Sequence, residues 1–371
     1  MAEHRGRVLV AMSGGVDSSV AAWLLKEQGY ECIGVTMKLF GNDAVGLDRG
    51  RPCCTLDDVE DAREVARRMG IPHYVFNFQE DFEEKVIRRF VDAYERGETP
   101  NPCIDCNRFL KFDRLYRRAV ELKCDFIATG HYARIGSDGA GGFHMTKAAD
   151  LSRDQSYVLY PIPRERLAHT LFPLGGLTKA EVREIAVREG FVNARKHDSQ
   201  DICFVPDGDY LAFMERYTGK TYPAGDILDR AGNVVGRHRG AAGFTIGQRR
   251  GVGVPSSGRI YVCGKCMADN TVTVGPEEAL YSTGCTAGEW NWLIPAPDGP
   301  FRALAKTRYR QTEQPVTVFP EGDRARLVFD RPQRAVTPGQ AAVAYDGSGA
   351  VLGGGTILTT EQPLYQTSVA K

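Results

Sequence analysis

Hydrophobic and polar residues follow different patterns in the two halves of the chain. In the first half, short buried-strand runs alternate with longer stretches of helical periodicity. Strands are expected at 7–12, 30–39, 72–78 and 124–131, and helices at 18–28, 55–70, 80–95 and 177–190. Strands separated by helices of this length predict βαβ units and a parallel sheet. In the last helix, Thr178 and Glu181 have the spacing of a capping box, and Gly190 marks its end.

After about Phe204 the pattern changes to short alternating segments interrupted by Gly and Pro. Strands are expected at 258–265, 270–275, 301–310, 315–320, 325–330, 340–346 and 353–358. Evenly spaced short strands are typical of a small barrel or sandwich. We therefore predict an α/β domain over 1–204, a middle linking domain over 205–275 and a C-terminal β-barrel over 276–371.

Composition narrows the class of protein. The 371 residues are 42% hydrophobic and 25% charged, which is typical of a globular protein, and no segment is long and apolar enough for a membrane span. Ten cysteines without a secretory signal favour a reducing, cytoplasmic location, where cysteines are more often catalytic or metal-binding than structural. Lys plus Arg and Asp plus Glu balance at 47 each, so nucleic-acid binding would need a local basic face.

The segment "AMSGGVDSS" (11–19) lies where the first strand ends and the first helix begins. Its two glycines let a ligand approach the backbone, and a helix N-terminus presents free N–H groups to phosphates. The serines add hydroxyl donors, and Asp17 can cap the helix or help to hold Mg²⁺. No Lys follows the glycines, which excludes the GxxxxGK[ST] phosphate loop. A glycine-rich turn of this kind can also be purely structural.

The stretch "TPNPCIDCNRF" (99–109) contains two prolines and two cysteines, and this punctuation predicts neither helix nor strand. Cys103 and Cys106 can hold a metal, bond to each other or attack a substrate. A third cysteine, Cys203, lies in a similar polar, turn-like setting.

Six motifs in order along nearly the whole chain resemble the tRNA-specific 2-thiouridylase family. The first also resembles the pyrophosphate-loop signature of enzymes that activate a carbonyl oxygen with ATP. The motifs are "SGGVDSS" (13–19), "TPNPCIDCN" (99–107), "GHYAR" (130–134), "SRDQSYVL" (152–159), "HDSQDICFVP" (197–206) and "FTIGQRRGVG" (244–253).

The resemblance implies a division of labour between two cysteines. Cys203 would receive sulfur as a persulfide from a sulfur-carrier protein supplied by a cysteine desulfurase. ATP would adenylate O2 of the tRNA wobble uridine, and sulfur would replace that oxygen with Cys106 as the second essential cysteine. Thiolates suit this work because they are nucleophilic and exchange disulfides readily. A transient Cys106–Cys203 disulfide would close each turnover.

The resemblance also implies roles for residues outside the cysteines. The ATP-binding residues would be Ala11, Met12, Ser13, Gly14, Gly15, Val16, Asp17, Ser18, Met37 and Gly130. The target base would meet Asn101, Pro102 and Cys103, and tRNA would contact His131, Arg153, Asp154, Gln155, Arg308, Tyr309 and Gln340. The cofactors implied are ATP and Mg²⁺.

Cys103 departs from the family pattern, which has Asp at this position. Asp105 is a candidate replacement for the missing acid or base. The change also places Cys103 beside Cys106 and Cys203 in the motifs, and three thiolates can hold a [4Fe–4S] cluster with one open iron. A persulfide relay, this cluster and a structural zinc half-site therefore remain as alternatives.

Weaker signals leave further alternatives. Cys263 and Cys266 form a second CxxC motif. We interpret it either as two free thiols of a β-hairpin or as half of a zinc site. Cys53 and Cys54 precede a helix and are expected to pack against it. The basic residues of 108–118 form a helical stripe that can follow a tRNA backbone or face solvent. The alternative functions are a small-molecule synthetase or amidotransferase with a pyrophosphate loop, and a nucleotide-sensing module without chemistry.

Overall fold

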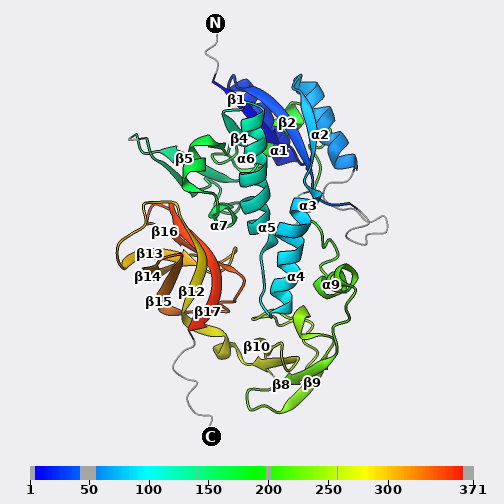
Figure 1. The fold of residues 1–371 in the computed structure, drawn as a ribbon, viewed down its shortest axis with the longest axis vertical. Coiled ribbons are helices and arrows are strands. Elements are labelled where there is room, and N and C mark those ends of the chain that lie inside the picture. Colours follow the sequence, from blue (N-terminus) through cyan, green and yellow to red (C-terminus); the bar gives the residue numbers. More distant parts are fainter. Residues whose placement is uncertain (1–4, 42–55, 140, 198–201, 257, 362–371) are drawn as a thin grey trace. The chain divides into compact units, whose positions relative to one another are not determined.

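The computed structural model describes residues 5–41, 56–139, 141–197, 202–256 and 258–361 (Figure 1). Cys53 and Cys54 lie outside these ranges. Two compact units are formed: the first takes 1–87, 102–208 and 348–351, and the second takes 88–101, 209–347 and 352–371. The domain boundaries at 204 and 275 stay predictions. None of the described helices is long and apolar enough to cross a membrane.

A parallel sheet organises the first unit, as predicted. Its five strands have the order β3-β2-β1-β4-β7, and Val8 of β1 lies beside Cys32 of β2 and Phe126 of β4. The strands are β1 Arg7–Ala11, β2 Glu31–Lys38, β3 His73–Asn77, β4 Phe126–Ala128 and β7 Thr170–Leu171. A separate hairpin, β5 Ala133–Ser137 with β6 Phe143–Lys147, was not predicted.

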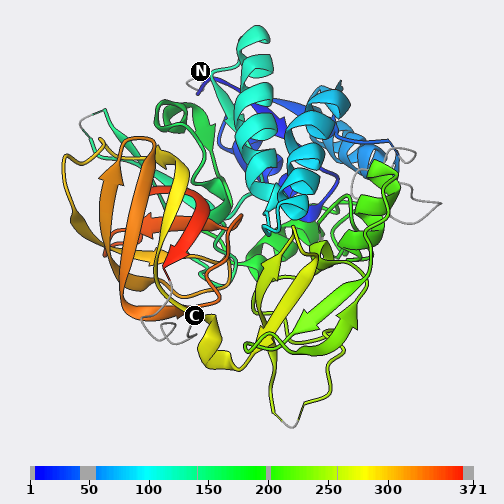
Figure 2. The ribbon, with the colours of Figure 1, turned by 60° about the horizontal axis from the view of Figure 1, so that its bottom comes forward.

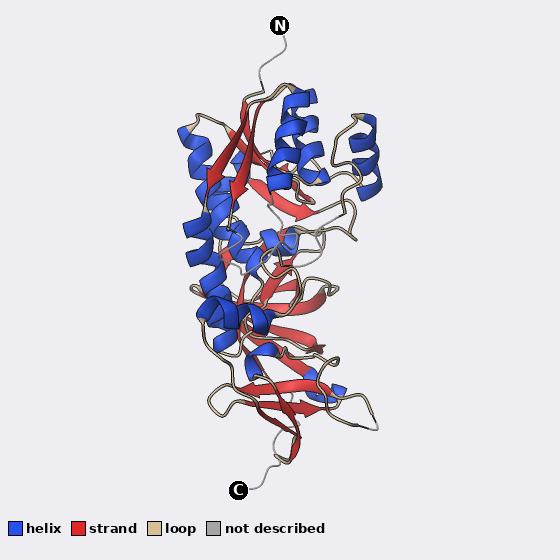
Figure 3. Cartoon of the chain, turned by 90° about the vertical axis from the view of Figure 1, so that its right-hand side faces the viewer, coloured by secondary structure: helices blue, strands red, loops and turns tan. Residues whose placement is uncertain are grey.

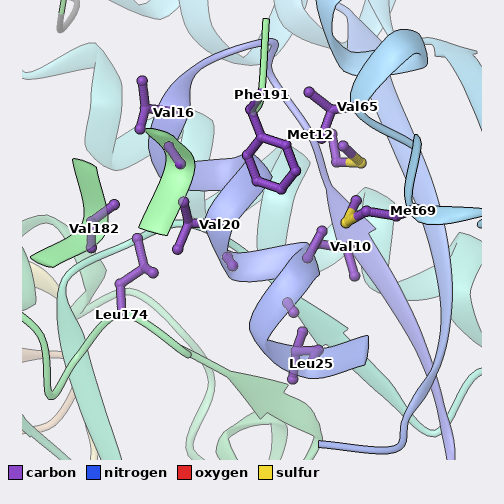
Figure 4. Close-up of a cluster of buried hydrophobic side chains, with 14 of the residues drawn as sticks. Val10, Met12, Val16, Val20, Leu25, Val65, Met69, Leu174, Val182 and Phe191 are labelled. Carbon is purple, nitrogen blue, oxygen red and sulfur yellow. The ribbon is translucent and has the colours of Figure 1, made fainter. Parts of the chain in front are cut away.

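Helices lie on both sides of this sheet (Figure 3). Val8 and Val10 of β1 pack with one apolar stripe from each of three helices, and Figure 4 shows Val10 in this cluster. Leu9 points to the opposite face and is also fully buried. Burial of both faces explains the continuous apolar run of β1. The three helices of this cluster are α1 Val16–Glu27, α2 Leu56–Met69 and α8 Lys179–Arg188.

The capping box predicted for α8 is confirmed. The Thr178 hydroxyl accepts from the Glu181 N–H at 3.3 Å, and the Glu181 carboxylate accepts from the Thr178 N–H at 2.7 Å. The helix predicted at 80–95 forms as three consecutive segments. They are α3 Gln79–Phe82, the π-helix η2 Glu83–Ile87 and α4 Arg88–Glu95.

The cysteine segment is helical, so the prediction that it forms neither helix nor strand is wrong. Helix α5 covers Pro102–Asp105, the π-helix η3 covers Cys106–Arg114, and α6 covers Leu115–Glu121. Pro102 occupies the first helical position, where its missing N–H would have had no intrahelical partner. A proline that breaks a helix interior can therefore also begin one. Further short elements of the unit are α7 Ser156–Leu159 and the 3₁₀ turn η4 Arg164–His169.

The second unit is mainly β-structure (Figure 2). Its smaller sheet has the order β10-β11-β8-β9, and the other strands close into a barrel of order β12-β15-β14-β13-β16-β17. The sheet strands are β8 Gly225–Leu228, β9 Val234–His238, β10 Tyr261–Cys266 and β11 Thr271–Gly275. The barrel strands are β12 Tyr281–Trp292, β13 Phe301–Lys306, β14 Gln314–Glu321, β15 Arg324–Arg334, β16 Ala341–Tyr345 and β17 Val351–Glu361.

The predicted C-terminal β domain is therefore a closed barrel, and the expected hairpin of Cys263 and Cys266 is confirmed as β10 with β11. The barrel interior includes Cys285, Leu327 and Phe329. Strand β12 was missed because small residues such as Gly284 and Gly288 obscure its alternation. The remaining elements are α9 Tyr210–Thr218 and the 3₁₀ turns η5 Ala241–Gly243 and η6 Glu277–Leu280.

Candidate active site

The nucleotide loop, defined here as residues 11–18, joins β1 to α1 at the carboxyl edge of the parallel sheet. The chain adds β2 and then β3 on one side of β1, and it adds β4 and then β7 on the other side. The strand order therefore reverses at β1. In open parallel sheets, ligands bind outside the carboxyl ends of the strands at such a reversal of strand order. The fold therefore places this loop where a nucleotide site is expected.

Serine hydroxyls hold the nucleotide loop in one conformation. Ser18 Oγ accepts from the Ser13 N–H at 3.1 Å and donates to the Gly15 carbonyl at 3.0 Å. Ser19 Oγ donates to the same carbonyl at 3.0 Å. Gly15 is the N-cap of α1 and has no side chain, so no side chain caps the first turn. An uncapped helix N-terminus can offer its N–H groups to an anion.

Gly14 is required by the backbone of the loop. Its φ of +75° is a left-handed conformation, and a Cβ there would collide with the Asp58 carbonyl. The Gly14 carbonyl accepts from Asn193 Nδ2 at 2.9 Å and from Lys196 Nζ at 3.3 Å. Lys196 also pairs with Asp58 at 2.5 Å. Two segments that are distant in sequence, 193–196 and the start of α2, thus fix one peptide of the loop.

Asp17 is bound by two donors that sequence reasoning missed. Lys179 Nζ lies 2.7 Å from Oδ1 and 2.9 Å from Oδ2, and the Tyr132 hydroxyl donates to Oδ1 at 2.8 Å. Lys179 is 8% exposed and Tyr132 is 3% exposed. The only available signal was positional, because Lys179 directly follows the Thr178 cap and Tyr132 follows "GH" in a motif. Asp17 does not cap α1 but holds a buried cation beside the loop.

The other predicted ATP residues lie at the same edge of the sheet. Gly130 follows β4, and a Cβ there would come within 2.8 Å of the Asp17 carbonyl carbon and the Ser18 nitrogen. Met37 lies near the end of β2, beside Phe76 of β3. The structure therefore brings Gly130 into contact with the nucleotide loop and places Met37 two strands away from β4.

Cys106 begins the π-helix η3 and is only 8% exposed. Burial raises the pKa of its thiol to about 11, while the ammonium of Lys111 on the same helix acts in the opposite direction. The next residue, Asn107, anchors the helix by donating from Nδ2 to the Val158 carbonyl at 2.9 Å. Cys106 is therefore a protonated thiol at neutral pH in this conformation.

The three site cysteines differ in exposure. Cys103 is exposed, Cys106 is buried and Cys203 is half-buried, and none of them is in a disulfide. Phe204, beside Cys203, anchors its segment by packing edge-to-face on Phe82 of α3 at 5.7 Å between ring centroids. In the described part of the chain, no three His, Cys, Asp or Glu side chains are grouped as metal ligands. The cluster at Cys103, Cys106 and Cys203 stays a prediction.

His131 has internal partners. Its Nδ1 is 2.7 Å from Thr129 Oγ1, and its Nε2 is 3.4 Å from Lys111 Nζ. Burial, followed by the charge of Lys111, holds the pKa of His131 well below its usual range, so the ring is neutral. The imidazole ring of His131 packs against the rings of Phe112 and Phe172, with 6.0 Å between ring centroids in each case.

The segment predicted to touch tRNA in the first unit forms a hydrogen-bonded loop. Arg153 is exposed, whereas Asp154 is buried and accepts from the Ala148 N–H at 3.1 Å and the Ser156 hydroxyl at 2.7 Å. Gln155 Oε1 accepts from the Tyr132 N–H at 3.0 Å. Asp154 and Gln155 therefore shape the loop that presents Arg153.

In the second unit, only one of the three predicted tRNA residues has a large exposed surface. Tyr309 is 38% exposed. Arg308 donates to the Ala335 and Ile246 carbonyls at 2.9 Å each and to the Thr337 hydroxyl. Gln340 Nε2 donates to the Thr99 carbonyl at 2.7 Å. Asn101 is half-buried and Pro102 is buried. Their contact with the target base stays a prediction.

Three family models match consecutive parts of the chain. A tRNA methyl transferase HUP domain matches residues 6–207, a tRNA methyl transferase PRC-barrel domain matches 211–276, and an aminomethyltransferase beta-barrel domain matches 282–357. These matches agree with the parallel sheet of the first unit and the closed barrel of the second.

Curated relatives match over nearly the full chain. The tRNA-specific 2-thiouridylase MnmA of Symbiobacterium thermophilum is 50% identical over 95% of this chain and 92% of its own length. The protein of the same name from Geotalea uraniireducens is 48% identical over 95% of each chain. A solved 4-thiouridine synthetase–RNA complex with bound ATP is 22% identical over 54% of this chain and 45% of that chain, and its TM-score of 0.37 is too low to establish a common fold.

Proposed function

Because the chain belongs to the tRNA-specific 2-thiouridylase family, we propose that it replaces O2 of the tRNA wobble uridine with sulfur in an ATP-dependent reaction. The observation that carries this proposal is that one compact unit contains both parts of the chemistry. It holds a preorganised nucleotide loop at the carboxyl edge of the sheet, and it holds the cysteines Cys106 and Cys203.

The nucleotide loop would bind ATP through backbone N–H groups of the α1 N-terminus and the serine hydroxyls. The uridine O2 attacks the α-phosphorus of ATP, pyrophosphate leaves, and the base carries AMP on oxygen. Lys179, held by Asp17 in the first turn of α1, would supply an ammonium group to the departing phosphates. Mg²⁺ would enter bound to these phosphates, since the carboxylate of Asp17 is already paired with Lys179.

Sulfur transfer would follow in two steps with a persulfide on Cys203. The terminal sulfur attacks C2 of the adenylated uridine, and AMP leaves with the original oxygen. Cys106, as thiolate, then attacks the inner sulfur of Cys203 and breaks the persulfide bond. The products are 2-thiouridine and a Cys106–Cys203 disulfide, which a dithiol reductant returns to two thiols.

This route uses only the two cysteines, whereas a cluster would also need Cys103 as a ligand. Cys103 would line the base pocket with Asn101 and Pro102. The half-buried Cys203 would take its sulfur from a persulfide-bearing carrier protein supplied by a cysteine desulfurase. Such a supply fits the predicted cytoplasmic location, where thiols stay reduced.

The proposal is tested with the purified full chain, ATP, a persulfide donor and one tRNA transcript carrying uridine at the wobble position. We expect 2-thiouridine by nucleoside mass spectrometry, with one pyrophosphate released per base modified. The matched control is the same transcript with cytidine at that position, which should give neither product.

Two results would contradict parts of the proposal. Pyrophosphate release at the same rate without tRNA would favour a small-molecule synthetase. About four iron atoms per chain after anaerobic purification, required for activity, would replace the persulfide route by a cluster.

A further inference from the structure

The two loops predicted to bind ATP and tRNA are bridged by two buried residues of the first unit. The nucleotide loop is residues 11–18, and the RNA loop is defined here as residues 150–155. Tyr132 is hydrogen-bonded to both loops, and Lys179 contacts the nucleotide loop through its side chain while its backbone N–H contributes to the lowered pKa of Asp150 in the RNA loop.

Tyr132 is bonded to the RNA loop through its backbone. Its N–H donates to Gln155 Oε1 at 3.0 Å, and its carbonyl accepts from the Gln155 N–H at 2.9 Å. Its hydroxyl reaches in the other direction and donates to Asp17 Oδ1 at 2.8 Å. The ring is 3% exposed and packs in the core cluster with Val16 and Ala148.

Lys179 repeats this arrangement from another element. At the other end of the RNA loop, the Asp150 carboxylate accepts from the Ser152 hydroxyl at 2.6 Å and the Ser152 N–H at 3.0 Å. These bonds, together with the backbone N–H of Lys179, lower the pKa of Asp150. The Lys179 ammonium then contacts both oxygens of Asp17.

Both connections end on one carboxylate in the first turn of α1. Asp17 is therefore held from both ends of the RNA loop, through Gln155 by way of Tyr132 and through Asp150 by way of Lys179. Both linking residues are too buried to change position without moving one of the loops. The position of Asp17 consequently depends on the conformation of the RNA loop.

We propose that Tyr132 and Lys179 are positioning residues that couple the RNA loop to the nucleotide loop, so that bound tRNA tightens the binding of ATP. Coupling between two binding sites is reciprocal, so ATP tightens the binding of tRNA by the same factor. The consequence for the proposed function, on which this inference rests, is that ATP is committed to adenylation only when a tRNA is present.

The experiment measures the Kd of a non-hydrolysable ATP analogue for the full chain, with and without saturating tRNA. We expect the wild-type ratio of the two Kd values to be about fivefold or more. Tyr132→Phe removes only the hydroxyl and keeps both backbone bonds to Gln155, so its ratio should fall to about half of the wild-type value or less while its Kd for tRNA alone changes less than about twofold.

Lys179→Gln is the second variant, because it removes the ammonium and keeps the backbone N–H that faces Asp150. It should also lower the ratio, and combining it with Tyr132→Phe should abolish the coupling. Tyr74→Phe is the matched control, since Tyr74 is 50% exposed on β3 and should keep the wild-type ratio. Thermal unfolding of each variant identifies any general loss of structure.

An unchanged ratio in Tyr132→Phe and Lys179→Gln would overturn the coupling, as would a wild-type ratio of one. The outcome is separable from that of the proposed function. A chain that forms 2-thiouridine with a ratio of one refutes the coupling alone. A chain that shows the ratio but forms no 2-thiouridine refutes the proposed reaction alone.

Discussion

The nucleotide loop and the sulfur cysteines lie in the same unit, but the fold prepares them to different degrees. The nucleotide loop is closed by hydrogen bonds from serine hydroxyls, Asn193 and Lys196, and Asp17 already has its counter-charge. The cysteines differ from one another in exposure, and no disulfide joins them. The nucleotide loop is therefore preorganised, whereas the proposed transient disulfide would form only with Cys106 and Cys203 within bonding reach of each other.

The same difference appears in the electrostatics of the two regions. The charge of Asp17 is balanced within the site by a lysine that lies 2.7 Å away. Cys106 has no such contact in its favour, and its burial dominates over the more distant charge of Lys111. We infer that substrate binding also has to favour the thiolate of Cys106, because its burial favours the thiol.

The largest effect is expected from removing either thiol. Cys106→Ser and Cys203→Ser should each lower 2-thiouridine formation by about a thousandfold or more, because a hydroxyl can neither carry a persulfide nor resolve one. ATP affinity should stay within about twofold of wild type, since neither cysteine belongs to the nucleotide loop. Nucleoside mass spectrometry and ATP titration measure the two quantities.

Cys263→Ser is the control for this pair, because Cys263 lies in the β10–β11 hairpin of the second unit. It should keep full activity. Normal thiolation by Cys106→Ser or Cys203→Ser would remove that cysteine from the proposed reaction.

The next effect concerns the reactivity of Cys106 toward a thiol-alkylating reagent. A pKa raised from 9.0 to about 11 lowers the thiolate fraction at pH 8 about a hundredfold. Alkylation of Cys106 in the free protein should therefore still increase at pH 10, as followed by peptide mass spectrometry. A plateau below pH 9 would show that the thiol is already activated. Cys285, whose buried thiol has its pKa raised to about 12, provides the unreactive reference.

The same shift has a consequence for folding. The folded chain keeps the Cys106 proton between about pH 9 and 11, whereas the unfolded chain loses it. The contribution of this site to the free energy of unfolding is thus complete below pH 9 and decreases as the pH rises through that window.

The sequence predicted the strand, turn and helix around the nucleotide loop because their signals are local. Strand, glycine pair and helix follow one another within a few residues, and the capping box of α8 is likewise a four-residue pattern. Lys179 and Tyr132 could not be found in this way. Their contacts with Asp17 span 162 and 115 residues, and they exist only because α8 and the segment after β4 pack against α1.

For the cysteine segment, the secondary structure predicted from the sequence was wrong. Its prolines were read as excluding helix, but Pro102 stands at the first helical position, where tertiary packing of α5 and η3 supports it. The π-helical register of Cys106–Arg114 has no sequence signature either. How near Cys106 lies to a partner cysteine in the reacting state is likewise a property of packing and substrate, which one sequence does not encode locally.

A smaller effect tests how rigidly the nucleotide loop is built. Gly14→Ala introduces a Cβ at φ +75° against the Asp58 carbonyl, so the loop must shift. We expect ATP affinity to fall by about tenfold or more, through strain of about 1–3 kcal/mol. Gly29→Ala is the matched control, because Gly29 also has a positive φ of +88° but a Cβ there meets no atom within 4 Å. Equal ATP affinities in the two variants would argue against a preorganised loop.

The smallest effect concerns the support of Lys179 by the cap of α8. Thr178→Ala removes the hydroxyl that accepts from the Glu181 N–H and should cost about 1 kcal/mol of local helix stability. Amide hydrogen exchange in the first turn of α8 should then accelerate about fivefold. Because Lys179 is the first residue of this helix, ATP affinity should fall by about two- to threefold.

Asp209→Ala is the matched control, because it removes the equivalent cap of α9 in the second unit, where Asp209 accepts from the Ala212 N–H at 3.0 Å. It should accelerate exchange in α9 and leave ATP affinity unchanged, so an equal loss of affinity in both variants would mean that the cap acts on global stability and not through Lys179.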